Sequence, residues 1–310
     1  MTSWRDKVAN RDILIIDGAM GTELERRGVP MHAETWAGAA LIEHPDKVRQ
    51  AHRDYIDAGA EVIITNTFGA SPHMLNAMGR GADAEQIIIG AVRLAQEARD
   101  ASGRDVAIAG SISTMSAGSD TADPGDRHTT QEIRDSMFRM ADALAQGGCD
   151  MIALEMMQDL TRAPMAMEAA RQTGLPVWLG LTCAWNAGRD TLVAFDFPET
   201  TFQAILDRLL PMGPDVVSVM HSDVDATTVA LDMVRQGFDG PLGAYPESGY
   251  FEMPHWNFVD VITPDELVAR AGGWIGQGVS ILGGCCGLGP EHIAALSAAR
   301  EDLQASKARP

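Results

Sequence analysis

The sequence is poor in three features, and each shortage excludes a class of protein. Four cysteines in 310 residues are too few for a disulfide framework, and reduced thiols predict a cytoplasmic protein. Basic residues number 24 against 43 acidic ones, for a net charge of -19, so we expect no nucleic-acid partner and no binding to anionic membrane surfaces. No apolar run approaches the roughly 20 residues that span a bilayer, so no membrane partner is predicted.

What the chain does contain is a regular series of short apolar runs, each followed by a segment with helical features. The expected strands are 13–17, 62–65, 106–109, 151–155, 177–181, 215–220, 241–245 and 279–282. Alternating strands and helices predict a parallel sheet with right-handed crossovers. Eight such units in 310 residues predict a closed (β/α)8 TIM barrel. An open doubly wound sheet is the alternative, but Gly18-Ala-Met-Gly21 lacks the Gly-rich phosphate-binding pattern.

The segments between the expected strands carry helix signals. Apolar residues at Ile87, Ile88 and Ala91 follow helical spacing, and Thr129 or Thr130 is expected to cap a helix that ends at Gly147-Gly148. The polar segment 115–128 is long enough to predict a lid or substrate loop. Nothing in the composition marks a linker, so we expect one domain over residues 1–310.

In a barrel of this kind, the carboxyl ends of all strands face one rim, where active sites lie. The strands of this chain end in polar or reactive side chains, which would therefore form one cluster. These residues are Asp17, Asn66, Ser111, Glu155, Cys183, His221, Tyr245, Cys285 and Cys286. Since the last strand of a closed barrel lies beside the first, we expect Asp17 next to the cysteine pair.

The run Gly283-Gly-Cys-Cys-Gly287 is the most informative stretch of the rim. Two neighbouring thiols at a strand end can bind one soft metal ion, and Zn²⁺ is the usual candidate. His221 lies two strands away and could complete a three-ligand site with one open position, which is typical of catalytic zinc. Cys183 is the alternative third ligand. The simpler interpretations of the pair are buried packing or a vicinal disulfide, which is strained and easily reduced.

Each remaining rim residue also has a plain structural interpretation. Asp17 could cap the following helix, and Glu155 could pair with a core arginine. His221 could bridge backbone groups, and Tyr245 could pack the mouth of the barrel. Cys149 precedes a strand, so we expect it at the opposite rim, where a thiol has no partner in the cluster.

Four segments resemble the homocysteine S-methyltransferase family, in the same order and over nearly the whole chain. They are Asp17-Gly-Ala-Met-Gly-Thr-Glu23, Thr65-Asn-Thr-Phe-Gly-Ala-Ser71, Tyr245-Pro-Glu-Ser-Gly249 and Gly283-Gly-Cys-Cys-Gly-Leu-Gly-Pro-Glu-His-Ile293. The resemblance implies a zinc-dependent barrel that methylates a small thiol, homocysteine, to form methionine. It also implies three cysteine ligands, of which one, at the end of the sixth strand, is replaced here by His221.

The resemblance also implies roles for other rim residues. Asp17 and Glu155 match the acids that hold the amino group of homocysteine, and we expect them to be the catalytic carboxylates. From their places at the rim, and not from the resemblance, we expect Asn66, Ser111 and Tyr245 to contact substrate, and Trp36 could offer an aromatic face to a sulfonium donor. The methyl donor would be a small onium compound or a separate methyl-corrinoid protein. A homo-oligomer is compatible with the sequence.

The exchange of a thiolate for a neutral imidazole has a chemical consequence. It removes one negative charge from the metal shell, so we expect the bound thiol to ionise more easily and its thiolate to be a weaker nucleophile. Two rival functions remain at this stage. One is a zinc hydrolase in the same barrel, with Asp17 or Glu155 as base, and the other is a non-catalytic thiol- or metal-binding relative.

Overall fold

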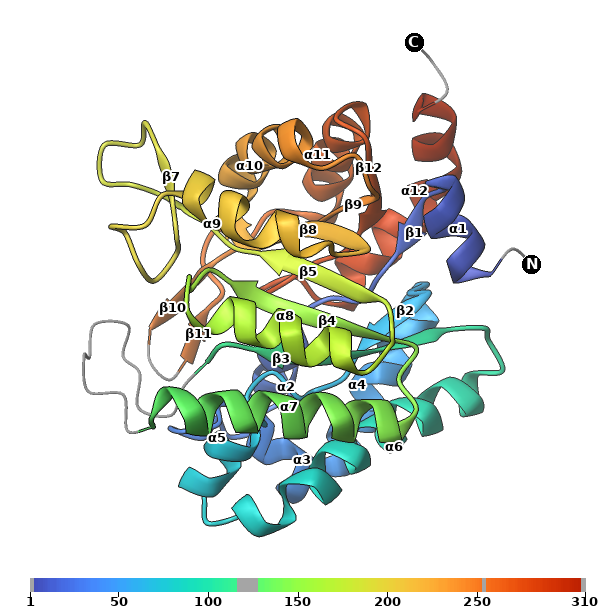
Figure 1. Cartoon of the computed structure of the whole chain (residues 1–310). Helices are drawn as coiled ribbons and strands as arrows, with labels where there is room; N and C mark the ends of the chain where they lie inside the picture. The colour runs from blue at the N-terminus through green and yellow to red at the C-terminus, as the bar shows by residue number, and fades with distance from the viewer. Residues whose placement is uncertain (1–2, 116–127, 253–254, 308–310) are drawn as a thin grey trace.

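Eight parallel strands form a closed barrel with helices packed around it (Figure 1). The structure is a computed structural model that describes residues 3–115, 128–252 and 255–307, so most of the expected lid segment, 116–127, lies outside the described residues. Around the sheet, the strand order is β1-β12-β9-β8-β5-β4-β3-β2. The ring closes between the first two strands, where Ile16 pairs with Val62 and the amide of Asp17 donates to the carbonyl of Val62 at 3.0 Å. The predicted TIM barrel is confirmed.

All eight expected strands are present, with small differences at their ends. The barrel strands are β1 (Leu14–Ile15), β2 (Val62–Ile64), β3 (Ala107–Ser113), β4 (Met151–Met157), β5 (Val177–Leu181), β8 (Val216–Asp223), β9 (Leu242–Glu247) and β12 (Val279–Leu282). The α-helices are α1 (Trp4–Asn10), α2 (Met20–Arg26), α3 (Ala40–Glu43), α4 (Pro45–Ala58), α5 (Pro72–Ala77), α6 (Ala84–Ser102), α7 (Thr130–Gly147), α8 (Arg162–Gln172), α9 (Phe202–Leu209), α10 (Val224–Gly237), α11 (Pro264–Gly276) and α12 (Pro290–Lys307). Short 3-10 turns lie at η1 (Ala37–Ala39), η2 (Gly81–Asp83) and η3 (Leu210–Met212).

The strands are apolar on both faces, because one face fills the barrel and the other packs on helices. Side chains of the barrel interior form one cluster: Leu14, Ile16, Val62, Ala107, Ala109, Met151, Ala153, Trp178, Val216, Met220, Tyr245 and Ile281. Helix α1, which the sequence pattern did not predict, contacts this cluster through Trp4 and Val8. The rings of Trp4 and Trp178 meet edge to face at 6.3 Å, so α1 covers the interior of the barrel.

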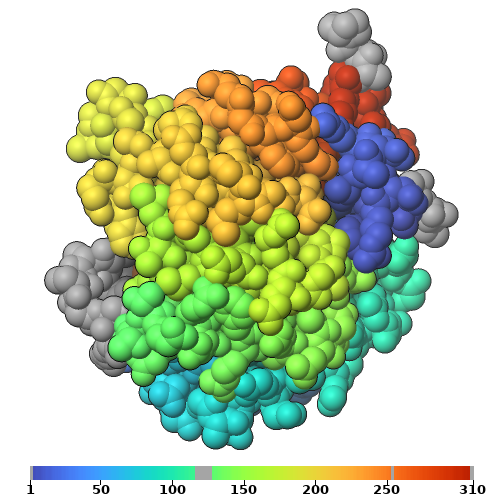
Figure 2. Space-filling model, viewed as in Figure 1, coloured from blue at the N-terminus to red at the C-terminus, as the bar shows by residue number. Residues whose placement is uncertain are grey.

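Two small hairpins follow barrel strands at their carboxyl ends. The first is β6 (Ala184–Trp185) with β7 (Leu192–Val193), and the second is β10 (Tyr250–Glu252) with β11 (His255–Asn257). Both lie on the left in Figure 1, and the first stands out from the surface in Figure 2. No helix within residues 3–115, 128–252 and 255–307 combines the length and the apolar character needed to cross a membrane.

Candidate metal centre

The turn after β12 holds the two adjacent cysteines in one backbone conformation. The amide of Cys285 donates to the carbonyl of Pro246 at 2.8 Å, and the amide of Ser248 donates to the carbonyl of Cys286 at 2.9 Å. Gly287 has φ +84, and a Cβ there would lie 1.8 Å from the carbonyl oxygen of Ser248. Only glycine can therefore occupy this position, and the turn docks directly on the segment that follows β9.

His221 reaches the barrel mouth because β8 is irregular at its end. Met220 points into the barrel, so regular alternation would send His221 outward toward the helices. Instead, His221 has φ 42, and the pairing of β8 with β9 shifts register between Met220 and Asp223. A bulge of this kind re-aims a side chain. The hydroxyl of Thr182 donates to the carbonyl of His221 and fixes the backbone in this conformation.

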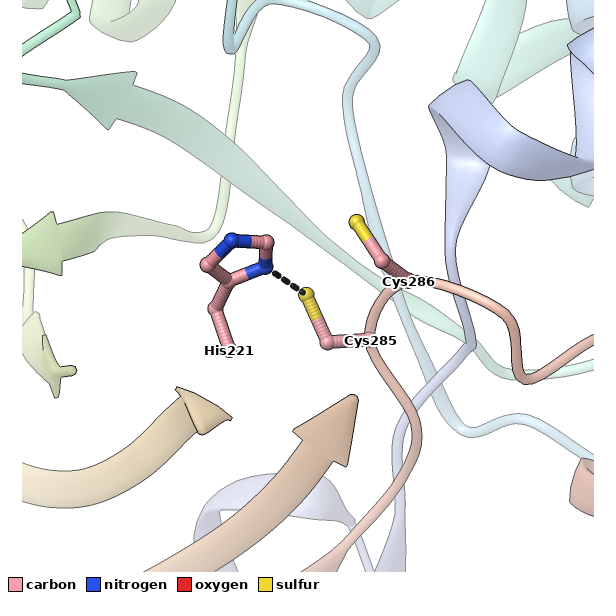
Figure 3. Close-up of side chains that lie close together, drawn as sticks. All are labelled: His221, Cys285 and Cys286. Atoms are coloured by element: carbon pink, nitrogen blue, oxygen red, sulfur yellow. Dashed lines mark hydrogen bonds between the residues drawn. The ribbon is translucent and has the colours of Figure 1, made fainter. Parts of the chain in front are cut away.

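His221, Cys285 and Cys286 converge on one point (Figure 3). The Nδ1 atom of His221 lies 3.5 Å from the Sγ atom of Cys285, and the ligand atoms of all three residues lie within 4.8 Å of one another. A tetrahedral ion with bonds of about 2.0 Å to nitrogen and about 2.3 Å to sulfur separates these two ligands by about 3.5 Å. The donor set and its spacing therefore fit a metal ion.

Cys183 takes no part in this group. Its side chain is fully buried in the core between strands and helices, and burial raises the pKa of its thiol to about 12. Its amide donates to the hydroxyl of Ser222 at 2.9 Å. Among the described residues, His221 is the third member of the cluster and Cys183 is not.

The charges of the cluster are strongly interdependent. The neighbouring thiol of Cys286, with the imidazole of His221, lowers the pKa of Cys285 to about 6, although burial opposes this. The same pairing raises the pKa of Cys286 well above its usual value. Burial disfavours protonation of His221, but the charges of Glu247 and Cys285 outweigh it and raise its pKa well above 6.5. One thiolate thus forms readily, whereas the second needs an added positive charge.

Glu247, to which the sequence pattern assigned no role, lies beside the imidazole. Its Oε2 atom is 2.9 Å from Nδ1 of His221, and the residue is 7% exposed. Glu247 follows Tyr245 by two positions on β9, so both side chains leave the same face of the strand. Since Tyr245 points into the barrel, this periodicity could have placed Glu247 at the mouth as well.

Two aromatic rings flank the imidazole. The ring centroid of Phe195 lies 5.0 Å from that of His221, and the centroid of Trp256 lies 6.2 Å away. Trp256 is held in place from two sides. Its amide donates to a carboxylate oxygen of Glu25 at 3.1 Å, and its indole nitrogen donates to the carbonyl of Ser248 at 3.3 Å. Aromatic surface therefore flanks the imidazole side of the candidate metal centre, and apolar surroundings of this kind strengthen electrostatic interactions.

The two predicted acids lie buried at the same mouth. The Oδ2 atom of Asp17 accepts the amide of Ile64 at 2.8 Å, while its Oδ1 atom has no hydrogen-bond partner among the described residues. Burial raises the pKa of Asp17 well above its usual value, and the charges of Glu155 and Cys285 add to the rise. Burial also raises the pKa of Glu155 to about 7, although the hydroxyl of Ser111 donates to this carboxylate.

Neither acid has the purely structural role considered from the sequence, which was helix capping for Asp17 and pairing with a core arginine for Glu155. Helix α2 has Ala19 at its N-cap with no side-chain hydrogen bond, so Asp17 does not cap it. Glu155 forms no ion pair with an arginine of the described residues, and its hydroxyl partner is Ser111. Both carboxylates thus remain available to a positively charged group at the mouth.

The other predicted substrate residues occupy defined positions. The side-chain amide of Asn66 donates to the carbonyl of Ala37 at 2.9 Å, which ties the end of β2 to the turn after Trp36. The ring of Trp36 meets the ring of Phe251 edge to face at 6.3 Å. Tyr245 is 6% exposed, and burial raises its pKa well above 10, with Glu155, Cys285 and Asp17 contributing. Tyr245 therefore lies within electrostatic reach of both acids and of the cysteine pair.

Comparisons with known proteins point to one family. The family model described as "Homocysteine S-methyltransferase" matches residues 14–300. The homocysteine S-methyltransferase of Escherichia coli K12 is 30% identical over 93% of this chain and 95% of its own length. Homocysteine S-methyltransferase YbgG of Bacillus subtilis is 27% identical over 94% of this chain and 96% of its own. The metallated crystal structure of the E. coli homocysteine methyltransferase MmuM superposes with a TM-score of 0.77 and 26% identity, covering 95% of this chain and 98% of that one.

Proposed function

The chain belongs to the homocysteine S-methyltransferase family, and from this premise we propose that it is a zinc-dependent enzyme that methylates homocysteine to form methionine. Members of this family are methyltransferases. One observation supports the proposal most strongly. His221, Cys285 and Cys286 converge at the same barrel mouth as the buried acids Asp17 and Glu155. The mouth thus offers one site for a thiol and another for an ammonium group, and homocysteine has both.

Three residues would hold the ion: His221, Cys285 and Cys286. Two sulfur donors and one imidazole favour zinc over magnesium or calcium, which prefer oxygen ligands. Three protein ligands leave one position for a substrate atom. When bound, the ion supplies positive charge that stabilises a thiolate at neutral pH. The same residues argue against the rival hydrolase, because two thiolates reduce the ability of a metal to acidify water.

The carboxylates would orient the substrate through its ammonium group. The Oδ1 atom of Asp17 is buried with no hydrogen-bond partner among the described residues, a condition that costs about 1–3 kcal/mol for a polar group. An ammonium donor would remove that cost and would also lower the repulsion between Asp17 and Glu155. With the amino group held there, the thiol can extend toward the cysteine pair on the neighbouring strand, since β1 pairs with β12.

The chemical step is the transfer of a methyl group from the sulfur or nitrogen of an onium donor to the thiolate sulfur of homocysteine. The thiol proton of homocysteine leaves to solvent, and the thiolate sulfur forms a bond to the methyl carbon as the bond between that carbon and the onium centre breaks. The donor departs as a neutral thioether or amine. We favour a small onium donor because aromatic faces attract such cations, and Phe195, Trp256 and Trp36 lie at this mouth.

A donor screen tests this proposal. Zinc-loaded protein is incubated with homocysteine and either S-methylmethionine, glycine betaine or a methyl-corrinoid protein, and methionine is measured by mass spectrometry. We expect methionine with the sulfonium donor, loss of both zinc and activity in Cys286→Ser, and retention of both in the matched control Cys183→Ser. Absence of methionine with every donor, from protein that still binds zinc, would overturn the proposed function.

A further inference from the structure

Gln158 is a buried amide that directly follows β4, the strand that carries Glu155. It is 3% exposed. Its Nε2 atom donates to the Oδ2 atom of Asp196 at 2.5 Å, and its Oε1 atom accepts the backbone amide of Asp196 at 2.7 Å. Since a buried amide without partners is costly, these two hydrogen bonds fix Asp196 against the end of β4.

Phe195, the residue before Asp196, lies against the candidate metal centre. Its ring centroid is 5.0 Å from that of His221 on β8. In the barrel, β5 lies between β4 and β8, and residues 195–196 belong to the segment that connects β5 to the next helix, α9. Gln158 on one side and His221 on the other therefore contact two adjacent residues of this segment.

The ring of Phe195 is not part of the apolar core formed by the described residues. Phe197 packs against the core between strands and helices, whereas Phe195 belongs to none of the core clusters and is partly exposed. Trp256, which also lies beside the imidazole of His221, is only 5% exposed. Phe195 thus keeps free aromatic surface next to the metal centre, and such a surface attracts cations.

We propose that Phe195 forms one face of the methyl-donor site and that Gln158, acting through Asp196, is the residue that positions it. The inference rests on the proposed function, because it takes the donor to be an onium cation. A cation must lie over the face of an aromatic ring to be attracted, so the place of the ring matters. Glu155 and Gln158 come from the end of one strand, so β4 sets the amino-group site and the donor face relative to each other. Methyl transfer depends on such alignment.

A binding experiment on zinc-loaded protein tests this role without turnover. Calorimetry measures the dissociation constants of S-methylmethionine and, separately, of homocysteine. Gln158→Leu keeps the size of the side chain but loses both hydrogen bonds, and Phe195→Leu removes the aromatic face. Each should weaken binding of S-methylmethionine by about 5- to 30-fold, the range expected for a contact between a cation and an aromatic face. Homocysteine affinity and zinc content should stay unchanged, because neither residue supplies a metal ligand or a carboxylate.

A charge-conserving double variant separates positioning from a general loss of structure. Gln158→Glu combined with Asp196→Asn reverses the donor and the acceptor of the side-chain hydrogen bond and keeps the bond to the backbone amide. It should restore binding of S-methylmethionine. The matched control is Gln203→Leu, which breaks a hydrogen bond of 2.8 Å between Gln203 and Asp207 on the exposed face of α9 and should change neither dissociation constant.

Urea unfolding shows whether each variant folds. The positioning role would be overturned by unchanged S-methylmethionine affinity in Gln158→Leu, by an equal loss of homocysteine affinity, or by a loss that the double variant does not restore. Absence of S-methylmethionine binding to the wild type would overturn it as well. A wild type that binds S-methylmethionine and homocysteine but forms no methionine would instead contradict the proposed methyl transfer alone.

Discussion

Replacement of Glu155 by glutamine should make the protein more stable and less able to bind its substrate. Burial raises the pKa of Glu155 from 4.5 to about 7 in the folded protein. The folded state therefore keeps the proton up to about pH 7, whereas the unfolded chain loses it near 4.5. Stability falls as pH rises through this window, because the folded state must ionise a buried group.

The magnitude follows from the two values. The difference between 4.5 and about 7 corresponds to roughly 3 kcal/mol of unfolding free energy lost between acid and alkaline pH. Glutamine keeps the shape and the contact with Ser111 but does not ionise. The difference in unfolding free energy between Glu155→Gln and wild type should thus be small at about pH 4.5. It should grow in favour of the variant, by up to about 3 kcal/mol, by about pH 8.5.

The assay is urea unfolding of the metal-free protein at several pH values. Glu199→Gln is the matched control, because it removes one carboxylate from an exposed position, and its curve should parallel the wild type. Homocysteine binding provides the second readout, and we expect Glu155→Gln to weaken it. A stability difference between Glu155→Gln and wild type that does not change with pH would refute this reasoning about the buried carboxyl.

Two further substitutions probe the cluster. Gly287→Ala should lower the unfolding free energy, measured by thermal unfolding, by about 3 kcal/mol or more and should lower zinc content, because φ is +84 and the new Cβ meets Ser248. The control is Gly272→Ala, where a Cβ meets nothing within 4 Å, and this change should be neutral or stabilising. Cys183→Ala should retain one metal ion per chain by elemental analysis, because the Cys183 thiol is buried in the core between strands and helices. Loss of the ion in this variant would show that Cys183 is a metal ligand.

The barrel could be predicted because each of its strands corresponds to a short apolar run, which is a local pattern in the sequence. Each apolar run fills one strand and ends at glycine or a polar residue, so the places of the eight barrel strands along the chain follow from the pattern alone. Helix α1 and the two hairpins could not be predicted in this way. Residues 4–10 form a helix whose two large apolar side chains, Trp4 and Val8, contact the barrel interior, a contact that no local pattern specifies.

The site was predicted in part, and the limits have physical causes. Strand ends meet at one rim, so the proximity of His221 to Cys285 and Cys286 followed from topology, and the structure brings them together. The bulge that turns His221 inward depends on tertiary packing, and regular alternation would have pointed it away. Glu247 was missed although its spacing from Tyr245 gave a usable signal.

The roles assigned to Asn66 and Ser111 stay predictions. Each hydrogen bonds to a protein group, Asn66 to the backbone of Ala37 and Ser111 to Glu155, so either could act on substrate through these partners. The roles of Trp36 and Tyr245 as substrate residues also stay predictions, as does the single domain over residues 1–310. Variants of each residue, compared by the KM for homocysteine, would decide between direct and indirect roles.

X-ray absorption at the zinc edge, recorded with and without homocysteine, tests the proposed metal centre most directly. We expect one zinc per chain bound by two sulfurs and one imidazole nitrogen, and one additional zinc–sulfur scatterer when homocysteine is added. A spectrum without the imidazole contribution, or one that homocysteine leaves unchanged, would contradict the proposal that this ion binds and activates the substrate thiol.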